Sequence, residues 1–170
     1  MQIISDFKKS DKFQNKIDSF LNFINLQSFF LLIKPNISIY SNQLEKNLID
    51  RQIENLITTG LKNLEISWSE NKNWKDYASK LKKKFPQINL GSASILNRKS
   101  IDESVEIGLA YSMMKFWDKD LINYAKAKNH LLIPGIKNIK DFKEAIDLNC
   151  KIIKIYPVKN KDKRIDISKY

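Results

Sequence analysis

The sequence predicts an α/β fold in which parallel strands alternate with helices. Short apolar runs alternate with stretches of helical periodicity along most of the 170 residues. Gly91, Ser112, Ile133 and Lys154 mark four successive later strands, and the interval between neighbours is 21 residues each time. So short a period fits right-handed βαβ units with parallel strands. Closing such units symmetrically gives the (β/α)8 barrel, also called the TIM barrel, and an open doubly wound sheet is the alternative.

In the first third of the chain, the sequence predicts a helix, a strand and a second helix, in that order. Ser10 is a candidate N-cap for a helix over about residues 10–26, where apolar residues recur at helical spacing. The continuous apolar run 28–33 is short enough for a buried strand. Ser41 is a candidate cap for a second helix, which Gly60 would end at its C-terminus.

The rest of the chain repeats this alternation. We expect strands at residues 61–67, 88–91, 109–114, 130–133 and 151–157, and helices at 74–85, 100–107, 118–128 and 138–148. Together with the first strand this makes about six βα units, and a closed barrel would need two more strands. The sequence therefore predicts one domain over residues 1–170, a TIM-barrel-type fold that is incomplete because its last two strands are missing.

Composition narrows the classes of function. The net charge is +11, but the excess is nearly all lysine spread along the chain, which argues against a dedicated nucleic-acid surface. Cys150 is the only cysteine, so no internal disulfide can form. The sequence contains no apolar run of membrane-spanning length and no signal-peptide core in residues 1–10, which predicts a cytoplasmic protein without a membrane partner.

Lys154 is the first candidate catalytic residue. It lies within Lys151-Ile-Ile-Lys-Ile-Tyr-Pro157, which has the apolar, β-branched character of a buried strand and a proline that ends it. Burying an ammonium group among isoleucines is costly and favours the neutral amine. A neutral amine at a strand end is the nucleophile that condenses with a ketone. The alternative is a lysine that extends its charged end to solvent at a sheet edge.

Three segments in order resemble the 2-keto-3-deoxy-6-phosphogluconate and 4-hydroxy-2-oxoglutarate aldolase family. They are Gly60-Leu-Lys-Asn-Leu-Glu-Ile-Ser67, Ile88-Asn-Leu-Gly-Ser-Ala-Ser-Ile-Leu-Asn97, and the stretch from Leu132-Ile-Pro-Gly-Ile136 through residues 141–148 to Lys154-Ile-Tyr-Pro157. The third segment is the most specific, because it keeps the family's separation between the Pro-Gly turn and the strand lysine. The resemblance covers about residues 28–158.

The resemblance implies a class I aldolase on a (β/α)8 barrel, usually a homotrimer. Lys154 matches the lysine that forms a Schiff base with the substrate, and Glu65 matches the glutamate that moves protons. The substrate class is a short 2-keto acid, such as 2-keto-3-deoxy-6-phosphogluconate or 4-hydroxy-2-oxoglutarate, cleaved to pyruvate and an aldehyde. This chemistry needs no metal and no cofactor.

Several positions depart from the family pattern. Ser69 stands where the family has the arginine that binds the substrate carboxylate, and a serine lacks that bidentate charged fork. Ser94 replaces a family threonine and keeps a hydroxyl, while Pro134 and Gly135 preserve the Pro-Gly turn. We expect these four residues to bind substrate. Met114-Lys-Phe116 replaces the Ser-Pro-Gly of the fourth strand, where Lys115 is a substitute cation or a solvated surface lysine.

The phosphate-binding part of the family pattern is also changed. Lys159-Asn-Lys-Asp-Lys-Arg164 stands where the family has glycine-rich backbone for the substrate phosphate. Two alternatives to the aldolase therefore stay open. One is a catalytically degenerate member that keeps the scaffold as an interaction protein. The other, from a different class, is a basic nucleic-acid-binding domain.

Overall fold

The computed structural model describes residues 2–27, 29–35, 40 and 42–155, with residues 2–10 described by their backbone. The helices are α1 (Gln2–Leu26), α2 (Gln43–Thr58), α3 (Trp74–Lys84), α4 (Arg98–Ile107), α5 (Lys119–Ala127) and α6 (Ile139–Asp147). The strands are β1 (Leu31–Ile33), β2 (Asn63–Ser67), β3 (Asn89–Ile95), β4 (Ser112–Met114), β5 (Leu132–Ile133), β6 (Gly135–Ile136) and β7 (Lys154–Ile155).

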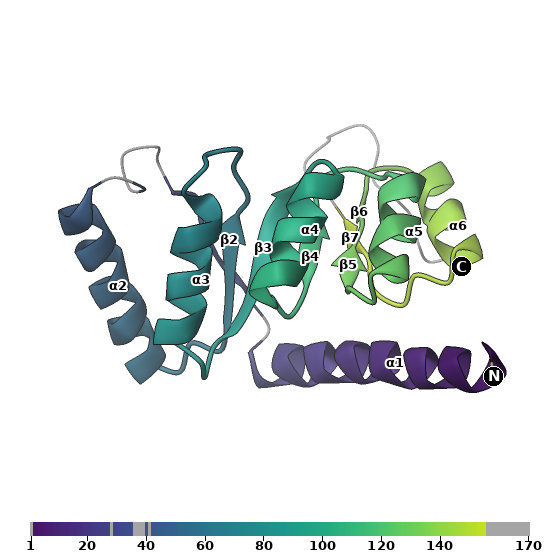
Figure 1. Ribbon diagram of the computed structural model, residues 1–170, viewed down its shortest axis with the longest axis horizontal. Helices are drawn as coiled ribbons and strands as arrows, with labels where there is room; N and C mark the ends of the chain where they lie inside the picture. The colour runs from purple at the N-terminus through teal and green to yellow at the C-terminus, as the bar shows by residue number, and fades with distance from the viewer. Residues whose placement is uncertain (1, 28, 36–39, 41, 156–170) are drawn as a thin grey trace.

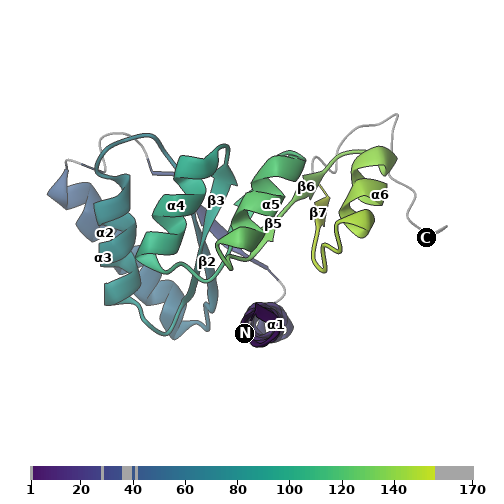
Figure 2. The same cartoon turned by 45° about the vertical axis from the view of Figure 1, so that its right-hand side comes forward.

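The strands are parallel and follow chain order, as the alternating pattern predicts. Strands β1 to β5 form one sheet in the order β1-β2-β3-β4-β5, and β6 pairs with β7 in a second, two-stranded sheet. Helices α2 to α6 stand side by side along one face of the strands, while α1 lies across their other side (Figures 1 and 2). The predicted α/β class with successive parallel βα units is therefore confirmed.

The register of the later strands differs from the 21-residue interval. Ser92 pairs with Ser112 and Ser112 pairs with Leu132, so equivalent positions lie 20 residues apart. Strand side chains alternate between faces, so a shift of one residue exchanges the inner and outer positions. Gly91 and Ser112 consequently lie on opposite faces of the sheet, and the residue equivalent to Gly91 is Tyr111.

The strand expected over residues 130–133 is followed, after Pro134, by a further short strand that was not expected. Proline has no N–H to donate to a strand ladder, and the sheet changes here from β5 to β6. The Pro134 carbonyl still accepts a hydrogen bond from the Lys154 backbone N–H at 2.9 Å. The Pro-Gly pair therefore joins the two sheets and fixes where the Lys154 strand attaches.

Asparagine and aspartate side chains begin four of the helices. The caps are Asn42 for α2, Asn97 for α4, Asp118 for α5 and Asn138 for α6, and each side chain accepts a backbone N–H of the first turn. The fourth helix was expected to begin at residue 100, but Ser100 is the third helical residue. Its hydroxyl accepts the Asn97 N–H at 3.3 Å, which completes a capping box.

Three other predicted features can be compared at the N-terminal end and in α2. The helix expected over residues 10–26 spans Gln2–Leu26, so Ser10 lies inside it and does not cap it. Ser41 lies outside the described residues, and the cap of α2 is Asn42. Gly60 follows the end of α2 with a φ of +101°, the left-handed conformation for which glycine is suited.

Two apolar clusters hold the layers together. The larger one lies between the sheet and helices α2 to α5 and includes Ile53, Ile66, Trp74 and Ile101, each at most 1% exposed. The second cluster lies between α1 and the other face of the sheet, and consists of Ile17, Phe20, Tyr111, Met113, Leu131 and Ile133. Helix α1 thus covers one face of the sheet, which we call the inner face, and Tyr111, Met113 and Ile133 lie on this face. Among the described residues, no helix has the length and apolar character needed to span a membrane.

Candidate active site

Glu65 lies in the middle of β2 on the inner face of the sheet. Glu65 is only 3% exposed. One of its carboxyl oxygens, Oε1, is buried without a hydrogen-bond partner among the described residues. Burial raises the pKa of the Glu65 carboxyl to about 7, while the charge of Lys154 acts in the opposite direction. A carboxyl in this range can hold or release a proton near neutral pH.

Lys154 begins β7 and lies within electrostatic range of Glu65. Its backbone is fixed by the pairing of β7 with β6, in which Lys154 stands opposite Gly135. The buried strand expected here is only half-buried: Ile152, Ile153 and Lys154 are intermediate in exposure, and Ile155 is 37% exposed. The reason is that β7 pairs with one described strand, so described neighbours cover it on one side only.

Ser94 and Ser67 place two hydroxyl groups at the C-terminal ends of β3 and β2. The Ser67 hydroxyl donates to Ser94 Oγ at 3.0 Å. Ser94 has a φ of 60°, an uncommon conformation for serine, and the β3–β4 register shifts between Ser92 and Ile95. This bulge brings Ser94 beside Ser67, which shares the inner face with Glu65 two residues earlier.

Pro134 and Gly135 are both buried, and the close approach of neighbouring backbone requires a glycine at position 135. A Cβ on Gly135 would lie 2.5 Å from the Lys115 carbonyl oxygen and 2.9 Å from that of Met114. Only glycine allows the β6 backbone to pass so close to the end of β4. The Pro-Gly pair therefore positions the Lys154 strand against the neighbouring units.

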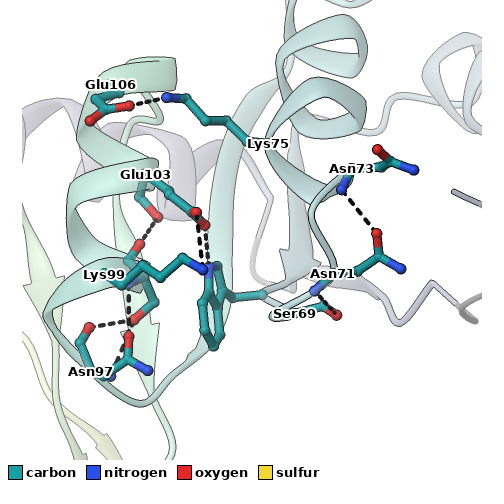
Figure 3. Close-up of polar contacts among 11 residues, drawn as sticks. Ser69, Asn71, Asn73, Lys75, Asn97, Lys99, Glu103 and Glu106 are labelled. Carbon is teal, nitrogen blue, oxygen red and sulfur yellow. Dashed lines mark hydrogen bonds and ion pairs between the residues drawn. The ribbon is translucent and has the colours of Figure 1, made fainter.

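Ser69 lies in the turn between β2 and α3 and is half-buried. Its hydroxyl accepts the Asn71 backbone N–H at 3.2 Å, and the Asn71 side chain in turn accepts the Asn73 N–H at 2.9 Å (Figure 3). The hydroxyl thus takes part in organising the turn before α3. Ser69 supplies no positive charge at the place where the family has an arginine.

Trp68, which follows the Glu65 strand, is directed away from the candidate site. Its indole N–H donates to Glu103 Oε2 of α4 at 2.8 Å, and Lys99 pairs with Glu103 at 4.0 Å (Figure 3). His130 likewise lies outside the site, 2.7 Å from the Ser112 hydroxyl in a buried network that continues to Ser92. No group of three potential metal ligands occurs in the described part of the chain.

The structure therefore places Lys154 close enough for its charge to act on Glu65, and it pairs the Ser94 hydroxyl with that of Ser67. The sequence alone did not identify Ser67 as a candidate site residue. The signal was present, because Ser67 follows Glu65 by two residues and alternate strand residues share a face. The bulge that turns Ser94 toward it left no comparable signal.

A family model described as "Aldolase: KDPG and KHG aldolase" matches residues 35–164 of this chain. A curated 2-dehydro-3-deoxy-phosphogluconate aldolase from Zymomonas mobilis is 30% identical over 83 residues, which is 49% of this chain and 40% of that protein. The chain thus spans about two fifths of this relative.

Solved structures of similar proteins share the fold. The 2-keto-3-deoxy-6-phosphogluconate aldolase of Zymomonas mobilis, solved with 3-phosphoglycerate, has a TM-score of 0.66 and 22% identity, over 81% of this chain and 61% of its own. KDPG aldolase from Legionella pneumophila, solved with pyruvate as a covalent carbinolamine intermediate, has a TM-score of 0.64 and 18% identity, over 76% of this chain and 58% of its own.

These likenesses confirm the predicted TIM-barrel-type fold, and the family model covers well over half of the chain. The order of the three sequence segments, the parallel βα units and the family model all agree. The chain belongs to the KDPG and KHG aldolase family.

Proposed function

We propose that this protein is a class I aldolase that cleaves a short 2-keto acid to pyruvate and an aldehyde. The observation that carries this proposal is the burial of the Glu65 carboxyl on β2 within electrostatic range of Lys154 on β7. An amine and a proton-carrying carboxyl near one another are the two groups that this chemistry requires.

In the proposed reaction the Lys154 amine attacks the keto carbon and forms a carbinolamine. Loss of water gives a protonated imine, which withdraws electrons from the neighbouring carbon–carbon bond. A base removes the proton from the hydroxyl on the far carbon, that bond breaks, and the products are an aldehyde and an enamine on Lys154. Protonation of the enamine and addition of water release pyruvate and restore the amine.

Glu65 is the group that we propose moves these protons. With a pKa raised to about 7 by burial, its carboxyl divides between both protonation states at neutral pH. General acid–base catalysis works best when the pKa of the group is close to the working pH. The same carboxyl could therefore take the hydroxyl proton and return a proton to the enamine.

Substrate contacts are proposed for Ser67 and Ser94, at the C-terminal ends of β2 and β3, and for Pro134 and Gly135, where β6 begins. The Ser67–Ser94 hydroxyl pair offers donors to a hydroxyl or carboxylate oxygen of the substrate. We also expect the homotrimer that the family resemblance implies.

Borohydride trapping with pyruvate tests the proposal. Reduction of the imine would attach the pyruvate skeleton irreversibly to Lys154, and peptide mass spectrometry would locate it. The Lys154→Arg variant should lose the adduct, whereas the matched control Lys151→Arg, three residues earlier and exposed, should keep it. Wild-type protein without an adduct, or with the adduct on another lysine, would remove the mechanism.

A second candidate function is a family scaffold without turnover, and Ser69 is the observation that favours it. Its hydroxyl is engaged in the turn before α3 and offers no cation for a carboxylate. If this candidate is right, the purified protein gives no aldehyde from 2-keto-3-deoxy acids even where Lys154 reacts with pyruvate. Robust turnover in a coupled pyruvate assay excludes it.

A further inference from the structure

Tyr111 lies beside Glu65 because of a glycine on the intervening strand. Gly91 of β3 pairs with Glu65 in the sheet register. A Cβ on Gly91 would lie 2.4 Å from both Cε2 and Cζ of the Tyr111 ring. The ring thus rests directly on the Gly91 backbone, and Cζ, the carbon that carries the hydroxyl, lies over the strand next to Glu65.

The two polar ends in this arrangement have no described partners. The Tyr111 side chain is fully buried at 0% exposure, and its hydroxyl makes no hydrogen bond among the described residues. Oε1 of Glu65 is also buried and unpaired within the same part of the chain. Buried polar groups are nearly always hydrogen-bonded, so two such atoms on the two sides of β3 indicate that a polar bridge connects them.

The aromatic ring of Tyr111 is held in place from the side of α1. The Phe20 ring packs edge-on against it with centroids 4.7 Å apart, and the Phe30 ring does so at 5.8 Å. Burial and the charge of Glu65 keep the pKa of the Tyr111 hydroxyl well above its usual range. The hydroxyl is therefore a neutral donor whenever the Glu65 carboxylate is present to accept.

We propose that Tyr111 is a positioning residue for Glu65, with one water molecule that accepts a hydrogen bond from the Tyr111 hydroxyl and donates one to the Glu65 carboxylate. This bridge fixes the orientation of the carboxylate on the inner face. Its role in the reaction rests on the proposed function of Glu65, but the Tyr111–Glu65 bridge itself does not.

The first test uses the protein without ligand. Tyr111→Phe removes the hydroxyl and keeps the ring between Phe20 and Gly91. Loss of a donor to the charged form should raise the pKa of Glu65 by about one unit. The measurement is a carbon-13 NMR titration of the glutamate carboxyl groups, with the Glu65 signal assigned by its absence in Glu65→Gln.

Tyr77→Phe is the matched control. The Tyr77 hydroxyl is also buried and unpaired among the described residues, but its ring packs against Tyr40, with centroids 5.9 Å apart. Its removal should leave the Glu65 titration unchanged. Identical Glu65 titrations in the wild type and in Tyr111→Phe would overturn the proposal.

The second test follows the rate of borohydride trapping by pyruvate across pH. Tyr111→Phe should move the pH profile to the alkaline side and lower the limiting rate at pH 7 about fivefold, with little change in the pyruvate concentration that gives half the limiting rate. An unchanged profile would count against the proposed role. If the wild type forms no adduct, the proposed function fails, and the ligand-free titration still decides whether Tyr111 binds Glu65.

Discussion

Glu65 shows how a single buried carboxyl sets the electrostatic character of this site. The residue is 3% exposed, and desolvation disfavours its charged form more strongly than Lys154 favours it. The folded protein therefore binds this proton more tightly than the unfolded chain does. Proton binding to Glu65 is thereby linked to folding.

The pH dependence of stability follows from the sign of that shift. Because the pKa of Glu65 rises from 4.5 to about 7 on folding, its stabilising contribution is complete below about pH 4.5 and is lost as the pH rises through 7. Relative to Glu65→Gln, which does not titrate, the wild type should lose about 3 kcal/mol of unfolding free energy between pH 4.5 and pH 8.

Urea unfolding of both proteins across this pH range measures the effect. Contributions of all other groups cancel in the difference between wild type and variant, provided that they titrate alike in both. A constant difference from pH 4.5 to pH 8 would show that Glu65 does not carry the raised pKa.

Gly135 and Ser69 show the limits of assigning roles from matched residues. Both were expected to bind substrate. The structure gives each a clear structural task, because Gly135 lets β6 pass the end of β4 and Ser69 accepts the Asn71 N–H in the turn. A substrate contact by either residue stays a prediction.

At the scale of elements, α1 covers the inner face of the sheet through a few residues. Phe20 is 3% exposed and stacks on Phe30, with ring centroids 5.6 Å apart, while it also meets Tyr111 edge-on. Leu26, at the end of the same helix, is 70% exposed. The helix therefore contributes to stability mainly through the face that contains Phe20.

Alanine substitution in α1 tests this account of the packing. Phe20→Ala should lower the free energy of unfolding by about 3–5 kcal/mol, since it removes a buried aromatic ring and leaves a cavity. Leu26→Ala should change it by less than about 0.5 kcal/mol. Equal costs in urea unfolding would mean that α1 does not pack on the sheet as described.

The register between β3 and β4 is the feature that sequence periodicity predicted least well. The marked residues of the third and fourth expected strands, Gly91 and Ser112, are 21 residues apart, whereas the sheet pairs Ser92 with Ser112. The bulge around Ser94 and the tight ring–glycine contact are properties of neighbouring strands. The pattern of residues along one strand does not encode the bulge or the ring–glycine contact.

At the scale of the whole molecule, the sequence carries a net charge of +11. Several lysines are paired with carboxylates on the helices. Lys84 bridges Asp50 and Glu54 at 2.8 and 3.1 Å, Lys80 meets Asp76 at 2.8 Å, and Lys128 meets Asp102 at 3.1 Å. These pairs reduce the field that a polyanion would encounter.

We therefore expect only weak, non-specific binding to nucleic acids. Labelled mixed-sequence DNA and RNA should show binding by fluorescence anisotropy at low salt and essentially none at about 150 mM salt, because such binding depends on counterion release. Submicromolar affinity that persists at that salt concentration would support the nucleic-acid-binding alternative.

The sequence by itself determined the alternation of strands and helices, the parallel α/β class and the family. These features depend on local periodicity, on prolines and caps, and on the order of short segments. Asn138 and Gly60, for example, specify a helix boundary through their own backbone and side-chain chemistry.

Only the tertiary structure decided the register of β3 and β4, the contact of Tyr111 with Gly91 and the burial of Glu65. Each of these depends on how segments distant in sequence pack against one another. A shift of one residue in a strand exchanges its faces, so the identity of the group next to Glu65 could be read only once the sheet was assembled.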